Sequence, residues 1–401
     1  MSIHRERRLQ ISSKFKVLIP MSKNPFHVMI VPTLGCPSNC AYCWSSDEHS
    51  PVMKKETVAA IATWLRDAWD GPVTFTFHGG EPLLAGYNFF SYALPLLAEH
   101  FSEVEAEFAI QTNLWLMTPE LAELFASYHV PIGSSIDGPE DITDFQRGKG
   151  YFEKTMRGYQ ISREKGLSVR FICTFTHQSI AHKDEIVSFF AEHGFPLKLH
   201  PALPSMKSDT PYEWALEPKE YGDLLSYLLD VQLSHLDEMV IMNIHDLCRS
   251  AFTGHGSVCT YADCMGYTFA IGPDGSIYPC YRFIGIPAFV MGSVHDVPKP
   301  TRDDLMCSPA GRLLDSFREV VDSSCKECRH ILFCRGGCPY NAIVPTNGKM
   351  EGVDPYCEAY RCIFDEIRDR LDAELYAPKK RSRREQRKHT GGIQGLIQRL
   401  T

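Results

Sequence analysis

Short apolar runs alternate with longer amphipathic segments between residue 26 and about residue 202. The short runs are rich in β-branched and aromatic residues, as strands are, and the longer segments repeat their apolar residues every three or four positions, as helices do. The expected strands are FHVMIVPT, PVTFTFHGG, EFAIQTN, VPIGSSI, LSVRFICTFT and PLKLHPA, and the expected helices include KKETVAAIATWLRDAW, PELAELFASYH and KDEIVSFFAEHG. A repeating strand–helix order predicts an α/β fold with a parallel sheet. Six units suit a partial (β/α)6 TIM-like barrel, with functional groups at the carboxyl ends of the strands.

The periodic pattern ends after residue 205. We expect a barrel domain over residues 1–205, a helical linker over 206–256, and a small Cys-rich domain over 257–376 in which Cys, Gly and Pro replace the helical period. The segment CIFDEIRDRLDAELY predicts a helix that closes the folded part. Residues 377–401 form a basic tail that we expect to be flexible, although GGIQGLIQRL has the pattern of a short amphipathic helix.

Composition narrows the location and the partners. The chain has 401 residues, of which 44% are hydrophobic, and a formal net charge of −8. It has neither an apolar signal segment nor an apolar run long enough to cross a membrane, so we expect a cytoplasmic protein without a membrane partner. The tail segment KKRSRREQRKH holds seven Lys and Arg residues. Such a run favours either a solvated tail or the capture of an acidic partner, such as a peptide leader, and we do not expect a nucleic-acid partner.

The 15 cysteines are too many for chance in a chain of this kind, and their clustering favours metal sites over disulfides. Cys36, Cys40 and Cys43 form C-x3-C-x2-C directly after the first expected strand. Three thiolates bound to a [4Fe-4S] cluster would leave one iron open to an exogenous ligand. A zinc site completed by a distant histidine has the same spacing.

The cysteine loop resembles that of the radical S-adenosylmethionine (SAM) superfamily. With an aromatic residue before the last cysteine, it resembles the superfamily signature C-x3-C-x-aromatic-C, and HGGEP after the second expected strand matches the GGE motif. The resemblance covers residues 27 to about 202 and implies a cluster that binds SAM. The SAM contacts that it implies come from Tyr42, Gly79, Gly80, Glu81, Asn113, Ser135, Asp137 and Arg147. The residues alone also fit a glycine turn at HGGEP, a turn at Asp137 and a surface ion pair at Arg147.

A second set of cysteines lies downstream. Cys264 and Cys280 belong to C-x10-G-x4-C, and C-x2-C-x5-C-x3-C followed by Cys357 completes the order of the seven-cysteine SPASM domain of peptide-modifying radical SAM enzymes, which this region resembles. Two zinc ribbons are the alternative from spacing alone. The resemblance implies two auxiliary [4Fe-4S] clusters, hence three in all. The expected ligands are Cys259, Cys264, Cys280 and Cys338 for the first cluster, and Cys325, Cys328, Cys334 and Cys357 for the second.

Cys259 lies outside the seven-cysteine pattern, so its role rests on a family ligand shortly before the motif. Cys362 is the alternative to it, and without either residue the first auxiliary cluster would have an open iron for a substrate thiolate. Cys173, Cys248 and Cys307 have no partner at ligand spacing, and we expect them to be buried or incidental thiols.

The resemblance implies reductive cleavage of SAM, with an electron from ferredoxin or flavodoxin, to a 5′-deoxyadenosyl radical that abstracts hydrogen from a C–H bond. The auxiliary clusters would then accept an electron, so we expect an oxidative maturase of a ribosomally made peptide. In the similar anaerobic sulfatase maturases an acidic base follows the cysteine of G-x4-C, where this chain has Tyr281. The run YPCYRFIG…FVMGSV is more similar to maturases that form thioether links in Cys-containing peptides, with Tyr281 as a positioning or acid/base residue or a packed aromatic one.

Two other functions remain open from the sequence. The first is an anaerobic sulfatase maturase that generates formylglycine, and the second is a non-catalytic iron–sulfur electron carrier. Cleavage of SAM separates the carrier from either enzyme.

Overall fold

The computed structural model describes residues 26–376, apart from residues 46, 48, 211, 236, 237 and 257, and residues 392–398. Six parallel strands lie side by side in the order in which they occur in the chain. They are β1 (Phe26–Ile30), β2 (Val73–Phe77), β3 (Ala106–Gln111), β4 (Ile132–Ser135), β5 (Val169–Phe175) and β6 (Lys198–Pro201). All six strands that the hydrophobic pattern predicts are therefore present, and the partial-barrel fold class is confirmed.

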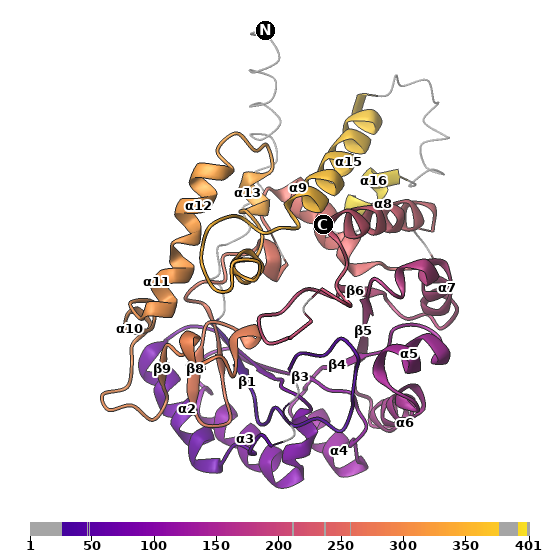
Figure 1. The fold of residues 1–401 in the computed structure, drawn as a ribbon. Coiled ribbons are helices and arrows are strands. Elements are labelled where there is room, and N and C mark those ends of the chain that lie inside the picture. Colours follow the sequence, from indigo (N-terminus) through magenta and orange to yellow (C-terminus); the bar gives the residue numbers. More distant parts are fainter. Residues whose placement is uncertain are drawn as a thin grey trace.

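Helices cover one face of this sheet (Figure 1). The covering helices are α2 (Lys55–Ala68), α3 (Tyr87–His100), α4 (Pro119–Ser127), α5 (Glu140–Arg147), α6 (Tyr151–Glu164) and α7 (Lys183–Glu192), with 3-10 turns η1 (Pro82–Ala85) and η2 (Ile180–His182) between them. Phe75 and Phe77 of β2 are buried on the covered face, where Phe77 packs against Phe90 of α3. The alternate residues Thr74 and Thr76 face the other side and are half-buried. This alternation places the hydrophobic core under the helices and leaves the inner face polar.

Three further strands extend the sheet beyond β1. β7 (Thr268–Ile271) pairs parallel to β1, and β8 (Ser276–Tyr278) and β9 (Gly292–Ser293) add antiparallel edges, which gives a nine-stranded sheet with the order β6-β5-β4-β3-β2-β1-β7-β8-β9. The sequence did not predict these strands, because they are only two to four residues long and have no helical or strand period around them. The start of the Cys-rich region is thus continuous with the barrel sheet.

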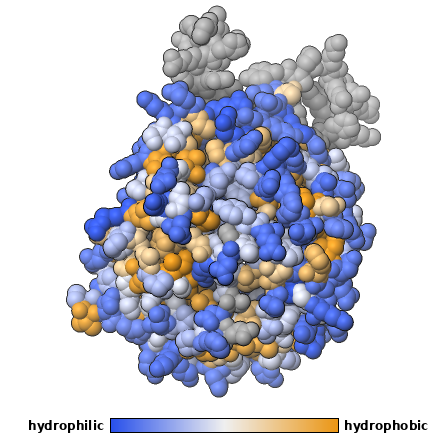
Figure 2. Space-filling view, viewed as in Figure 1, coloured by the Kyte–Doolittle hydropathy of each residue, from blue (hydrophilic) through white to orange (hydrophobic). Residues whose placement is uncertain are grey.

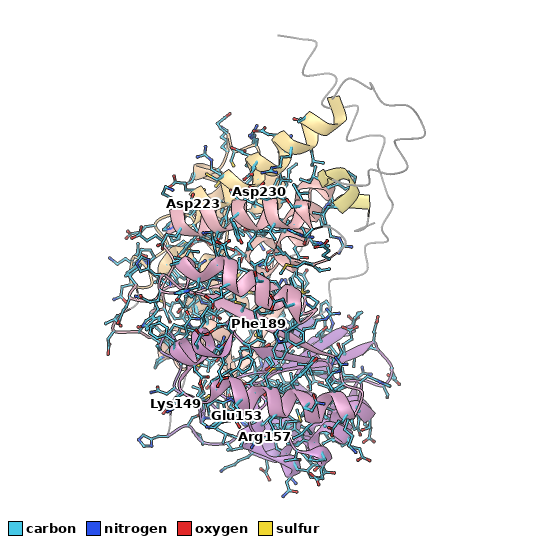
Figure 3. The ribbon with its side chains drawn as sticks, turned by 90° about the vertical axis from the view of Figure 1, so that its right-hand side faces the viewer. Lys149, Glu153, Arg157, Phe189, Asp223 and Asp230 are labelled. Carbon is cyan, nitrogen blue, oxygen red and sulfur yellow. The ribbon has the colours of Figure 1, made fainter. Side chains whose placement is uncertain are left out.

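Short helical elements make up most of the rest of the Cys-rich region. They are η3 (Cys259–Tyr261), η4 (Tyr281–Phe283), η5 (Pro287–Phe289), α10 (Arg302–Met306), α11 (Pro309–Asp315), α12 (Phe317–Ser324), α13 (Ile331–Cys334) and α14 (Pro339–Ile343). The linker contributes α8 (Pro218–Ser234) and α9 (Met242–Thr253), as its pattern predicts. In Figure 3, α6, α7 and α8 lie one above another, marked by Arg157, Phe189 and Asp223.

The carboxyl-terminal elements pack on the linker helices. α15 (Cys357–Tyr376) contacts α8 and α9, and α16 (Gly392–Gln398) lies against α15 and α9. Ile393 and Leu396 are buried in the same apolar cluster as Leu225 and Ile367. The amphipathic helix indicated by GGIQGLIQRL is therefore present, whereas the basic run at 379–389 lies outside the described residues.

The surface in Figure 2 is mainly hydrophilic, with scattered hydrophobic residues. Within the described part of the chain, no helix combines the length and the apolar character that a membrane span requires.

Candidate functional site

The segments that the sequence singles out meet at the carboxyl ends of the strands. The cysteine loop follows β1, the HGGEP turn follows β2, and Asn113 follows β3. Ser135 ends β4, and Asp137 follows it after Ile136. Because neighbouring parallel strands end on the same edge, these groups surround one mouth of the barrel.

The three thiols of the loop are free and lie near one another. Cys36 and Cys40 are half-buried, and Cys43 is exposed. Burial and, to a smaller extent, the negative charges of Glu81, Cys43 and Cys40 together raise the pKa of Cys36 to about 12. A thiolate at these positions needs a nearby positive charge, which the iron of a cluster would supply. Among the described residues, no three His, Cys, Asp or Glu side chains lie as a single metal ion would require.

Gly79 and Gly80 let the turn after β2 approach the cysteine loop closely. A Cβ atom on Gly79 would lie 2.3 Å from the Thr33 carbonyl oxygen, and one on Gly80 would lie 2.2 Å from that of Leu34. Gly79 also has a φ of +139°, which side chains disfavour. The Gly80 N–H donates to the Thr33 carbonyl (3.1 Å). The two glycines therefore hold the start of the loop against the sheet edge.

Glu81 is fully buried and joins the turn after β2 to the end of β3. Its carboxylate accepts hydrogen bonds from the Thr112 hydroxyl (2.7 Å), the Asn113 N–H (2.7 Å) and the Leu83 N–H (2.9 Å). Burial raises its pKa to about 7. The Asn113 side-chain amide in turn lies 3.8 Å from the Cys36 sulfur. Glu81 thus positions the amide that approaches the first thiol.

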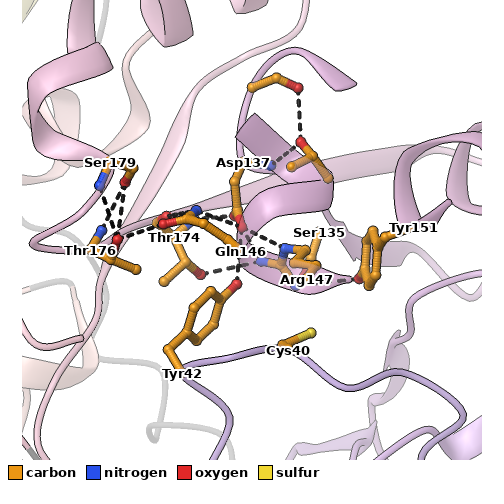
Figure 4. A network of polar contacts seen from close by, with 12 residues as sticks. Cys40, Tyr42, Ser135, Asp137, Gln146, Arg147, Tyr151, Thr174, Thr176 and Ser179 are labelled. Carbon is orange, nitrogen blue, oxygen red and sulfur yellow. Dashed lines mark hydrogen bonds and ion pairs between the residues drawn. The ribbon is translucent and has the colours of Figure 1, made fainter. Parts of the chain in front are cut away.

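Asp137 and Arg147 form a buried ion pair behind the cysteine loop (Figure 4). Arg147 donates to both carboxylate oxygens, at 2.7 and 2.8 Å. The same carboxylate accepts from the Tyr42 hydroxyl (3.1 Å), the Gln146 side chain (2.9 Å) and the Thr174 N–H (2.8 Å). These contacts engage both oxygens of the Asp137 carboxylate. The Asp137–Arg147 ion pair therefore anchors Tyr42, and through Tyr42 it anchors the cysteine loop. A SAM contact for Asp137 or Arg147 stays a prediction.

Four strands, β3 to β6, and the residue directly after β2 each contribute one polar side chain on the inner face. We call these side chains the mouth ring, and they are His78, Gln111, Ser135, Thr174 and His200. The Gln111 amide donates to the Ser135 hydroxyl (3.3 Å), and Thr174 is the register partner of His200. His78, Gln111 and Ser135 are half-buried, whereas His200 is exposed. The ring is the polar inner wall of the site.

Tyr281 enters this wall from the Cys-rich region. Its hydroxyl donates to the Gly79 carbonyl (2.6 Å), and its ring lies 4.0 Å from the His78 ring and 5.6 Å from the Trp44 ring, centroid to centroid. Burial raises its pKa, and the nearby Cys43 and Cys36 raise it further. Lys207 lies over the other side of the site, 4.9 Å from the Trp44 ring. Tyr281 is therefore beside the three thiols, as a wall residue and hydrogen-bond donor.

The eight downstream thiols fall into the two expected groups. Cys264 donates to Cys259, which lowers the pKa of Cys259 to about 7, and Cys280 and Cys338 are close enough to interact electrostatically with this pair. In the second group, burial raises the pKa values of Cys325, Cys334 and Cys357, and the charge of nearby Cys328 raises each of them further. Cys362 is exposed and interacts with Lys219 on α8 instead. The proximity favours Cys259 over Cys362 as a member of the first group.

Comparison with known proteins identifies the superfamily. Residues 30–190 match the sequence profile described as "Radical SAM superfamily". This chain belongs to the radical SAM superfamily. An uncharacterized protein of Methanothermobacter thermautotrophicus is 58% identical over 231 residues, which cover 58% of this chain and 88% of the relative.

Relatives with assigned activities are more distant but span nearly the whole length. The cysteine-type anaerobic sulfatase-maturating enzyme of Clostridium perfringens (strain 13) is 25% identical over 86% of this chain and 97% of the relative. The solved structure of native anSMEcpe with bound AdoMet and Cp18Cys peptide superposes with a TM-score of 0.76 at 25% identity, over 87% of this chain and 98% of that one. The protein is thus a radical SAM enzyme, which rules out the non-catalytic electron carrier.

Several site residues of this radical SAM enzyme carry no signal in the sequence. Asp354 is fully buried and accepts from the Cys338 N–H (2.9 Å), the Tyr356 N–H (2.9 Å) and the Tyr360 hydroxyl (3.1 Å). It therefore fixes backbone next to one thiol of each group. Arg282, over the Tyr340 ring at 3.8 Å, donates to the Pro204 carbonyl (2.7 Å). Burial raises the pKa of nearby Cys338 to about 11, and the positive charge of Arg282 opposes this rise. Neither residue belongs to a motif, and long-range contacts alone reveal them.

Proposed function

We propose that this radical SAM enzyme oxidises a cysteine-containing peptide, in the manner of a peptide maturase. The superfamily fold implies a [4Fe-4S] cluster and SAM, and we assign the cluster to Cys36, Cys40 and Cys43. When bound, these groups supply a 5′-deoxyadenosyl radical that abstracts a hydrogen atom from a C–H bond. The three free thiols fit such a cluster, because burial raises the pKa values of Cys36 and Cys40 and so favours their thiolates only next to a strong positive charge.

The chain's own residues would hold the reactants in place. A small pocket beside the cysteine loop is lined by Tyr42, Cys43, Trp44, Ala202, Ser205 and Trp214 among others. Its position between the loop and the end of β6 suits the part of SAM that extends beyond the cluster. The inner wall, from the mouth ring to Tyr281, would position the peptide and exclude water from the reacting carbon.

The side chain at position 281 bears on which product the enzyme forms. The sulfatase maturases that this chain resembles use an acidic base in its place. The Tyr281 hydroxyl is committed as a donor to Gly79 and its raised pKa keeps it protonated, so it cannot accept a proton near pH 7. We therefore assign Tyr281 to positioning, and we favour a sulfur-to-carbon thioether link over formylglycine.

Formylglycine formation is the second candidate. The relatives named as sulfatase-maturating enzymes favour it, and they align over 86% of this chain. The solved relative with a bound peptide supports a peptide as the substrate in either case.

Mass spectrometry separates the candidates. Anaerobically reconstituted protein is incubated with SAM, dithionite and the Cp18Cys peptide, or with a co-expressed cysteine-containing peptide. We expect 5′-deoxyadenosine and a peptide that has lost two hydrogens and no longer reacts with thiol reagents. A peptide that has lost sulfur and gained a carbonyl would establish formylglycine instead. Absence of 5′-deoxyadenosine would reject the proposal altogether.

We also propose two auxiliary [4Fe-4S] clusters on the two thiol groups, and a ferredoxin or flavodoxin as the electron donor. Three clusters require about twelve irons and twelve sulfides per chain. Zinc in the Cys-rich region would contradict this assignment.

A further inference from the structure

Both candidate reactions release a proton from the substrate thiol. In the thioether reaction, C–H and S–H are replaced by C–S, and in the formylglycine reaction CH–SH first becomes C=S. Either way the peptide loses one hydrogen atom, which the 5′-deoxyadenosyl radical takes, one proton, and one electron, which an oxidised [4Fe-4S] centre of the Cys-rich region takes. A group of the protein must accept the proton. Tyr281, which stands where the similar enzymes have an acid, does not.

Most other basic or acidic groups at the mouth are already engaged. Glu81 and Asp137 are fully buried and hydrogen-bonded within the protein. His78 accepts the Gly79 N–H at Nδ1 (2.8 Å), so its neutral ring presents only an N–H on the other nitrogen. Lys207 donates to the Ile284 carbonyl (2.9 Å) as an ammonium. None of these four side chains has both a free lone pair and access to the inner space.

His200 differs from these four side chains in both its hydrogen bonding and its access to the inner space. It lies one residue before the carboxyl end of β6, on the inner face, where barrel enzymes place catalytic groups. Its side chain is exposed, and it makes no hydrogen bond within the described part of the chain. The ring interacts electrostatically with His78, which stacks on Tyr281, and with Arg282, which follows Tyr281. His200 therefore lies within electrostatic range of two residues that neighbour Tyr281 in space or in the chain.

We propose that His200 is the catalytic residue that accepts the thiol proton of the peptide, in place of an acidic residue at position 281. The surroundings keep its ring neutral and able to accept. Although the side chain reaches solvent, the surrounding protein and, to a smaller extent, the positive charges of Arg282 and Lys198 together lower its pKa to about 4. This inference rests on the proposed peptide oxidation.

The test uses His200→Gln, which is neutral and similar in size but is not a base. With the cysteine peptide that the wild-type enzyme modifies, Cp18Cys in the first instance, the variant should still form 5′-deoxyadenosine. The ratio of modified peptide to 5′-deoxyadenosine should fall by about 100-fold. His200→Gly should lose product in the same way and regain it with added imidazole. His235→Gln, an exposed histidine paired with Glu238 on the linker side, is the matched control and should behave as wild type.

A second readout does not depend on turnover. Diethyl pyrocarbonate modifies accessible neutral histidines, so His200 should react in the wild-type protein and saturating peptide should protect it, whereas His235 should react equally with and without peptide. A wild-type product ratio in His200→Gln, a lost product that imidazole does not restore, or no protection by peptide would each overturn the proposal. A wild-type protein that forms no 5′-deoxyadenosine or leaves the peptide unchanged would instead reject the proposed function.

Discussion

The three-thiol loop and the second downstream thiol group are held in different ways. The loop is fixed by buried polar contacts that involve no thiol, chiefly Tyr42 on Asp137 and the close approach of Gly80 to Leu34. Two thiols of the second group, Cys325 and Cys328, pack in a small separate apolar cluster with Phe317, Val321 and Ala342, whereas Cys334 lies in a larger one. A site that is preorganised by the fold can keep its shape without metal, whereas one with a small core depends on the metal for its folding energy.

The largest expected effect is therefore a loss of structure in the Cys-rich region when iron is removed. After anaerobic removal of iron with a chelator, backbone amides of residues 317–357 should lose most of their protection against hydrogen exchange. Amides of β1 to β5 should keep theirs, because two large apolar clusters cover these strands. Hydrogen exchange measured by mass spectrometry provides the check, with the iron-loaded protein as the reference. Equal loss of protection in both regions would mean that the two do not differ in their dependence on metal.

Two single-cysteine variants test which thiol belongs to the first downstream group. Cys259→Ser should remove one cluster, a loss of about four of twelve irons per chain. Cys362→Ser should remove none, because Cys362 is exposed and interacts with Lys219 and not with the first group. Iron and sulfide analysis of the reconstituted variants measures both. Loss of iron in the Cys362 variant alone would reverse the assignment.

The anchor of the three-thiol loop can be broken without touching a thiol. Arg147→Met leaves the Asp137 carboxylate buried without its cation, which should cost about 3–5 kcal/mol of unfolding free energy. Arg66→Met breaks an exposed pair with Glu103 and should cost at most about 1 kcal/mol. Urea unfolding of the metal-free proteins measures both changes. Similar values for the two variants would show that the buried pair does not hold the loop.

Glu81 gives a smaller effect with a defined sign. Its pKa rises from 4.5 to about 7 on folding, so the folded state binds its proton more tightly than the unfolded state does. Protonated Glu81 makes its full contribution to the unfolding free energy below about pH 4.5. This contribution decreases by up to ~3 kcal/mol as the pH rises to 7. The unfolding free energy of the wild type minus that of Glu81→Gln should therefore decrease over this range in metal-free protein. A flat or rising difference would contradict the raised pKa.

The sequence predicted the elements that have a local signal. Periodicity located six strands and most of the flanking helices. The resemblance to the SPASM domain implied the two groups of downstream thiols, and their role as cluster ligands stays a prediction. The sequence did not predict β7 to β9, because these strands are only two to four residues long and the pairing of β7 with β1 joins residues far apart in the chain. The role of Asp354 was not predicted either, because its partners are backbone N–H groups and a tyrosine hydroxyl, which form no recognisable motif in the sequence. His200 sits in a strand whose pattern showed only that the strand exists.

The pairing of β1 between β2 and β7 also sets an order for synthesis and assembly. β2 becomes available to β1 soon after translation begins, but β7 begins only at Thr268. Until then, one edge of the strand that carries the cysteine loop has no partner, and such an edge is a template for wrong association. The loop that precedes all other functional segments in the chain is thus among the last to be enclosed. Nascent or truncated chains that end before residue 271 should be the ones that most need protection from aggregation.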